Sequence, residues 1–123
     1  MGSDALDRVA FAAWLIFIAI LTLTPLPAGT PGGQYNIDKM VHFGLFFVFA
    51  LLAFRLRKEP SWESYTIIIL GALVYGTMIE FAQMFIPGRF FDVLDITAGV
   101  VGAFAYFAIV AFANSRTGYT YFR

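Results

Sequence analysis

The chain has 123 residues, of which 60% are hydrophobic and 13% are charged, and its eight basic and eight acidic side chains give a formal net charge of zero. Soluble globular chains are about 45–50% apolar and about 25% charged, and a soluble domain of this size has too little interior to hide the excess. We therefore expect a membrane protein with one domain, residues 1–123. The neutral charge excludes the basic footprint of a nucleic-acid-binding protein, and the absence of cysteine excludes disulfides and a thiol nucleophile.

Four hydrophobic stretches follow one another along the chain. Each is close to the roughly 17–25 residues that a membrane-spanning helix needs. The joints between them are rich in Pro and Gly, then charged, then short and polar, as loops are. The predicted fold class is all-α, a four-helix transmembrane bundle. The predicted spans are Val9–Leu26, Met40–Leu56, Tyr65–Ile86 and Val93–Ala113, and the joints are Pro27–Gln34, Arg55–Ser64 and Pro87–Asp92.

The first stretch has a second interpretation, a secretory signal peptide cleaved near Pro27–Gly29. Such a peptide begins with an excess of basic residues. Here Asp4 and Asp7 stand against Arg8 alone. That charge balance favours a spanning helix.

Small residues recur at helical spacing in the last two stretches, Ala72 with Gly76 and Ala98 with Gly102. Because such pairs let helices approach closely in a membrane, we expect the third and fourth helices to pack together there. The tail Tyr119–Arg123 mixes aromatic residues with Arg, which is typical of a membrane interface.

The basic residues predict the orientation. With four spans, both termini and the second joint lie on one side of the membrane. The positive-inside rule makes the more basic side cytoplasmic, so we expect a multi-pass protein of the cell membrane with both termini in the cytoplasm. The cytoplasmic side carries Arg8, Arg55, Arg57, Lys58, Arg116 and Arg123, and the other side carries Lys39 and Arg89.

Most polar residues in or beside the spans fall toward the outer side. Glu80 is the most informative, because it lies within a span, about 10 Å from the outer end at 1.5 Å per residue, where a charge costs about 2.5–3.5 kcal/mol. Neither a capping role nor snorkelling explains it. The clustering predicts a functional site with these candidate ligand-binding residues: Asp38, Lys39, His42, Glu80, Gln83, Arg89, Asp92 and Asp95.

Structural roles compete with functional ones at several of these positions. Asp38 and Asp92 each precede an apolar run as an N-cap does, and Asp95, three residues after Asp92, would complete a capping box. Lys39 would snorkel to the interface. Gln83 would satisfy its neighbouring acid or backbone carbonyls, and Arg89 would form an interfacial ion pair with Asp92.

The chemistry open to the site is acid–base catalysis by an imidazole and carboxylates, with His42, Glu80 and Asp95 as the catalytic candidates. A proton or cation relay through His42 and Glu80 fits equally well. All four serines fall on the inner side, which disfavours a Ser–His pair. One histidine with hard oxygen donors is a weak metal signature, so neither a metal nor a cofactor is predicted.

Several short motifs, taken in order, resemble the VanZ-like family of membrane proteins. The resemblance runs from about Val9 to Ala113. One departure is Gly99, where the family usually has Asn, so a role that depends on that amide is absent here. The motifs are Thr22–Pro25, Asp38–Phe43, Glu80–Gln83, Pro87–Arg89 and Asp92–Asp95.

The resemblance implies a multi-pass protein of a bacterial or archaeal envelope, and it marks the same eight candidate residues. The family's namesake is linked to resistance to the antibiotic teicoplanin. Our leading hypothesis is a non-enzymatic protein that binds an anionic, lipid-linked or glycopeptide ligand, with membrane lipid as its other partner. The alternatives are a membrane enzyme acting on a phosphorylated or acylated lipid-linked substrate through His42 and Glu80, and a structural partner of another membrane protein.

Overall fold

The computed structural model describes residues 2–25, 34–58 and 61–117, and this part of the chain contains helices and no strand. The helices are α1 (Gly2–Leu23), α2 (Gln34–Arg57), α3 (Trp62–Gln83) and α4 (Val93–Thr117). Each is long and apolar enough to cross a membrane, which confirms the predicted all-α transmembrane architecture. Most of the first joint (27–33), two residues of the second (59–60) and the interfacial tail Tyr119–Arg123 lie outside the described residues.

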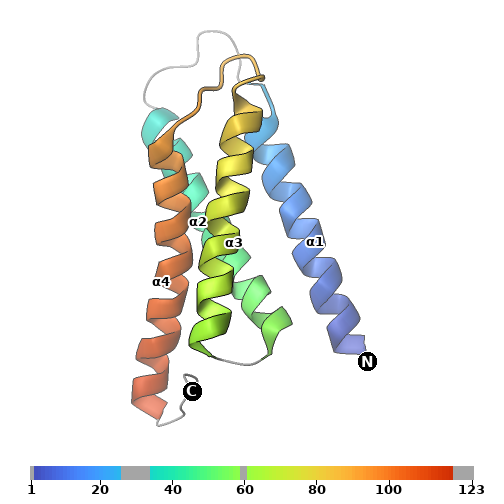
Figure 1. Ribbon diagram of the computed structural model, residues 1–123, viewed down its shortest axis with the longest axis vertical. Coiled ribbons are helices and arrows are strands. Elements are labelled where there is room, and N and C mark those ends of the chain that lie inside the picture. Colours follow the sequence, from blue (N-terminus) through green and yellow to red (C-terminus); the bar gives the residue numbers. More distant parts are fainter. Residues whose placement is uncertain (1, 26–33, 59–60, 118–123) are drawn as a thin grey trace.

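The four helices run side by side along the long axis of the molecule (Figure 1), with α3 between α1 and α4 in this view and α2 behind it. Because the chain reverses direction at each connection, α1 and α3 end, and α2 and α4 begin, at the same end of the bundle. We call this the polar end, because it holds the candidate site described below.

The first helix begins seven residues before the predicted start, and its early turns carry acids that pair with the end of α2. Asp7 lies 3.0 Å from Arg55 Nε, and Asp4 pairs with Lys58. These contacts give the polar first turns of α1 a partner on the bundle. The helix stops at Leu23 because Pro25 disfavours helical geometry in the residue before it.

The third helix begins at Ser61, which caps it by accepting the Ser64 N–H at 3.1 Å. It ends at Gln83, three residues before the predicted end. The next three N–H groups bond instead to carbonyls three residues back, at 3.0–3.2 Å, and Gly88 then takes a positive φ of 81°. Glu80 is thus in the last turn of α3, roughly 4.5 Å from its end at 1.5 Å per residue. From the sequence we expected Glu80 to lie deeper, about 10 Å from the outer end of its span.

Gly99 and Gly102 of α4 face α2, so the prediction that Gly102 joins α4 to α3 is wrong about its partner, although α3 and α4 do pack against each other. A Cβ atom added at Gly102 would lie 2.1 Å from the carbonyl oxygen of Phe43, and one at Gly99 would lie 2.9 Å from the ring of Phe46. Gly76 of α3 faces the same Phe46 ring, at 3.5 Å. The buried Phe46 side chain is therefore a wedge around which three helices pack.

Replacing Gly102 with Ala should destabilise the bundle, because the new methyl group would force α4 away from the α2 backbone. Overpacking of this kind costs about 1–3 kcal/mol. The matched control is Gly44→Ala, where the Cβ would meet no described atom within 4 Å and helix propensity predicts a gain of up to about 1 kcal/mol. Thermal unfolding of the two purified variants in detergent, followed by circular dichroism, measures the difference. Equal melting temperatures would rule out the close α2–α4 contact.

Candidate functional site

The polar end brings the candidate residues together in two layers. The outer layer, the rim, is partly exposed: the side chains of Asp38, Asp92, Lys39 and Arg89 are 34%, 23%, 20% and 9% accessible. The inner layer, the floor, consists of Asp95, His42 and Glu80, whose side chains are 4%, 2% and 1% accessible. The eighth candidate, Gln83, is buried one turn after Glu80.

The start of α4 is capped by two carboxylates. Asp92 accepts the Leu94 N–H at 2.9 Å, which confirms the N-cap predicted at Asp92. The N-cap predicted at Asp38 is wrong, because α2 begins at Gln34 and Asp38 lies inside it. The partner of Asp92 in the cap is Glu80 of α3, whose Oε2 accepts the Asp92 N–H at 2.9 Å, and not Asp95, which turns toward Lys39 instead. The expectation that no cap explains Glu80 is therefore wrong for one of its two oxygens. Sequence spacing could not reveal this cap, because the acid comes from another helix.

The backbone carbonyls at the end of α1 also receive hydrogen bonds from side chains that are far away in the sequence. Gln83 Nε2 donates to the carbonyl of Thr22 at 2.8 Å, and Arg89 donates to the carbonyls of Thr24 at 3.1 Å and Leu21 at 3.4 Å. The last carbonyls of a helix have no partner within it, so these side chains supply the missing donors. Of the two structural roles considered for Gln83, the structure shows the one with backbone carbonyls.

Two groups of ion pairs form the rim. Lys39 Nζ lies 2.9 Å from Asp92 and 3.2 Å from Asp95, so its ammonium group joins α2 to the start of α4. Arg89 Nη1 lies 3.4 Å from Asp38. Arg89 therefore pairs with Asp38 and not with Asp92 as predicted. The reason is that its guanidinium group also donates to carbonyls at the end of α1, and in that position it lies beside Asp38 of α2.

The floor contains an oriented imidazole. His42 Nδ1 lies 2.9 Å from the backbone oxygen of Asp38. Because a carbonyl oxygen only accepts, Nδ1 carries a hydrogen, and in the neutral imidazole Nε2 then has a lone pair. Nε2 lies 3.4 Å from Glu80 Oε1, and neither atom has a hydrogen-bond partner in the described part of the chain.

Sequence reasoning missed the role of Thr22 and Thr24, whose backbone carbonyls receive Gln83 and Arg89. Both residues belong to the motif Thr22–Pro25. A sequence suggests what their side chains can do, but it does not show that their backbone carbonyls accept hydrogen bonds. The side-chain hydroxyls bond within α1, to Ile18 and Ile20. The contribution of this segment to the site is therefore made by its main chain.

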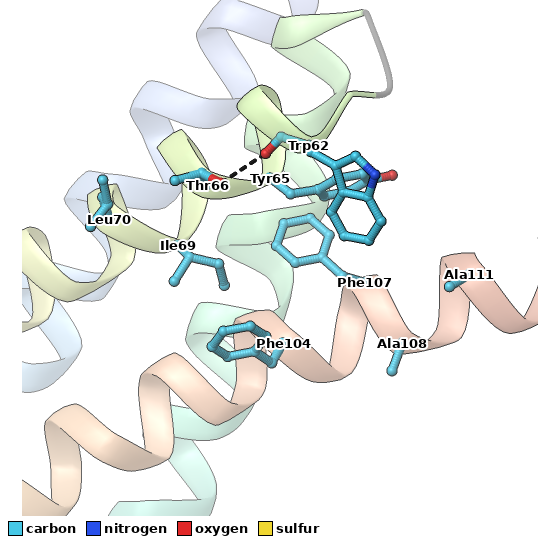
Figure 2. A pocket seen from close by; sticks show the side chains of 9 residues that line it. All are labelled: Trp62, Tyr65, Thr66, Ile69, Leu70, Phe104, Phe107, Ala108 and Ala111. Atoms are coloured by element: carbon cyan, nitrogen blue, oxygen red, sulfur yellow. Dashed lines mark hydrogen bonds between the residues drawn. The ribbon is translucent and has the colours of Figure 1, made fainter. Parts of the chain in front are cut away.

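An apolar groove between α3 and α4 lies away from this cluster, with a volume of about 490 Å³. Figure 2 shows Trp62, Tyr65 and Ile69 on one side and Phe104 and Phe107 on the other, and the Thr66 hydroxyl bonded to the Trp62 backbone. Its described lining begins at the first residue of α3, at the end of the bundle opposite Glu80. The groove and the polar cluster are therefore separate features.

Comparison with known proteins identifies the class. The family described as VanZ/LLP1 matches residues 8–114. The chain belongs to this family. It is also 34% identical over 92 residues to the Schizosaccharomyces pombe protein named Uncharacterized protein C11E3.10. That match covers 71% of this chain and 55% of the yeast protein, so the chain spans about half the length of this relative. A fungal relative shows that similarity of this kind is not confined to bacteria and archaea. No solved structure matches the chain.

Replacing Gln83 with Leu should destabilise the fold, because the buried carbonyl of Thr22 would lose its donor. An unsatisfied buried acceptor costs about 1–3 kcal/mol. Met84→Leu is the control, since the neighbouring Met84 side chain is 55% exposed and the change conserves its volume. Thermal unfolding in detergent should place Gln83→Leu well below both wild type and control. A Gln83→Leu variant as stable as Met84→Leu would contradict this role.

Proposed function

We propose that this protein is an envelope membrane protein that binds an anionic, lipid-linked or glycopeptide ligand at its polar end, with that end in the outer half of the membrane and both termini in the cytoplasm. The observation that carries the proposal is the two-layer cluster: two cations at a partly exposed rim above a buried floor. Ionisable groups inside a membrane protein are costly and mark functional sites by default. A role in resistance to teicoplanin would follow from ligand binding at this cluster.

The rim favours an exchange of partners. Lys39 and Arg89 are paired with carboxylates, so an incoming phosphate or carboxylate must replace one of them. Asp38 and Asp92 are 34% and 23% accessible, and ion pairs exposed to this extent are worth roughly 0–1 kcal/mol. An anionic head group that binds Arg bidentately makes stronger, charge-assisted bonds. The exchange is therefore favourable for a ligand that presents two or more anionic oxygens.

Exposed aromatic residues flank the rim and suit a ligand with a lipid part. Phe90 follows Arg89 directly and is 81% exposed, and Phe85 on the preceding turn is 85% exposed. Aromatic side chains at this position lie where head groups meet acyl chains in the proposed topology. A head group at Arg89 would bring its lipid chain alongside these rings.

A second candidate, a membrane enzyme acting on a phosphorylated or acylated lipid-linked substrate, is favoured by one observation. The His42 ring is held in one orientation by the Asp38 carbonyl and faces Glu80 at 3.4 Å, which is the arrangement of an acid–base pair. In this candidate His42 Nε2 accepts the proton of an attacking water and Glu80 stabilises the imidazolium. The third hypothesis, a purely structural partner, predicts no ligand response at all.

Binding should be measured with the protein in lipid nanodiscs, titrated in one arm with undecaprenyl diphosphate and in a second arm with teicoplanin. We expect one arm to saturate, and Lys39→Gln and Arg89→Gln each to weaken binding at least tenfold, because each removes a charge-assisted bond. Lys58→Gln, which removes a cation at the opposite end of the bundle, should leave the affinity unchanged. Equal losses in all three variants, or no saturation in either arm, would refute the binding proposal.

The same samples separate the two candidates. After incubation with wild-type protein, a ligand of a binding protein is recovered unchanged in a mass spectrum. A substrate is converted, and the conversion is lost in His42→Ala while binding persists.

The orientation can be tested by labelling introduced cysteines, because the natural chain has none. Pro87→Cys, in the connection from α3 to α4, should react with a membrane-impermeant maleimide in intact cells. Glu63→Cys, at the start of α3, should react only after the membrane is opened. Both side chains are exposed, so labelling depends only on whether the reagent reaches that side of the membrane. The reverse pattern would place the polar end on the cytoplasmic face.

A further inference from the structure

We propose that the floor of the polar cluster binds one divalent cation of the zinc class, ligated by Asp38, His42 and Asp95, with Glu80 facing His42 from α3. The inference does not depend on the proposed anionic ligand. It rests on three observations: the charge balance of the cluster, two lone pairs that face each other, and the spacing of the donor atoms.

The cluster carries a net negative charge. Four carboxylates, from Asp38, Glu80, Asp92 and Asp95, meet only two permanent cations, Lys39 and Arg89. The positive ends of α2 and α4 offset part of the excess. Two of these acids, Glu80 and Asp95, are 1% and 3% exposed, where an uncompensated charge is costly. A divalent cation restores neutrality without protonating either acid.

The facing lone pairs point to where the missing positive charge belongs. His42 donates from Nδ1 to a backbone carbonyl, so Nε2 of the neutral ring is an acceptor. Glu80 uses Oε2 to cap α4, so Oε1 is also an acceptor. These two atoms lie 3.4 Å apart with no other hydrogen-bond partner in the described chain. A stable arrangement needs something positive between or beside them.

The orientation of His42 is that of a metal ligand. Histidines that bind metals usually donate their other ring N–H to a carboxylate or backbone carbonyl, which sets the tautomer. The Asp38 carbonyl does this for His42, and it lies one turn earlier on the same helix, so α2 itself holds the ring in place.

The donor spacing fits one ion. A ring nitrogen of His42 and one carboxylate oxygen each from Asp38 and Asp95 lie within 4.8 Å of one another. Bonds of about 2.0–2.2 Å place ligands of a tetrahedral zinc ion roughly 3.3–3.6 Å apart, so the widest pair of donors needs to contract by up to roughly 1.5 Å. The distance of 3.4 Å from Nε2 to Glu80 Oε1 already has this value. Imidazole with carboxylates suits zinc better than magnesium or calcium, which prefer oxygen alone.

The competing occupant is a proton shared by His42 and Glu80, with no metal. It satisfies the two lone pairs but leaves Asp38 and Asp95 close together without a common partner. The two possibilities differ in one measurable respect, which is saturable, stoichiometric binding of a metal ion.

The test begins with protein purified without a histidine tag and stripped by a chelator. Isothermal titration with Zn²⁺ in detergent should show one ion per chain. His42→Gln and Asp95→Asn should each weaken the affinity at least tenfold, as loss of a ligand does. Asp92→Asn is the matched control within the cluster, because it removes one charge yet keeps a good N-cap; it should change the affinity less than threefold. Equal losses in all three would indicate diffuse attraction and overturn the proposal.

A second measurement needs no variant that risks misfolding. The chain has a single histidine, so an imidazole nitrogen coordinated to the metal in wild-type protein identifies His42. Pulsed electron paramagnetic resonance with Cu²⁺ as the probe should show coupling to one imidazole. Saturable binding without that coupling, or no saturable binding of Zn²⁺ or Cu²⁺, would overturn the proposal and favour the shared proton.

Discussion

The polar end of this bundle depends on one constraint: the backbone groups at helix ends have no partner within their own helix, and a surrounding of apolar side chains and lipid offers none. Four helix ends meet there. At the start of α4, Asp92 accepts the Leu94 N–H and Glu80 accepts the N–H of Asp92 itself. At the end of α1, Gln83 and Arg89 donate to backbone carbonyls. Each partner comes from a different element than the end it satisfies, except Asp92. The contacts therefore lock the order and the register of the helices as well as closing their ends.

The residues of the cluster divide into those that close helix ends or pair with one another and a smaller remainder. Gln83, Asp92 and one oxygen of Glu80 are used in closing helix ends, and the rim cations pair with neighbouring acids. What is left is Nε2 of His42, the other oxygen of Glu80, and the neighbouring carboxylates of Asp38 and Asp95. A ligand or ion has a reason to bind there, because these groups gain the most from it. The strongest functional signal is thus narrower than the eight residues suggested by sequence, and it is centred on His42.

Packing around Phe46 puts the floor in place. The ring lies against Gly99 of α4 and Gly76 of α3, and it belongs to α2 one turn after His42. The absence of side chains at these glycines lets the three helices come close enough for His42, Glu80 and Asp95 to share one site. Gly99 stands where the family usually has Asn. In this chain the position serves packing, since a Cβ there would lie 2.9 Å from the Phe46 ring, and a larger side chain would require the ring to move.

The sequence by itself determined the class of protein, the four helices with ends within seven residues of those observed, and the set of polar residues, because hydrophobic length and the scarcity of charge are properties of composition and order. It also predicted the N-cap at Asp92, a contact between near neighbours. Only the tertiary structure decided which helix Gly102 approaches, that Glu80 caps a different helix, and that Arg89 pairs with Asp38. The physical reason is that these contacts join residues 12 to 59 positions apart, and neither helical spacing nor local propensity carries information about such pairs.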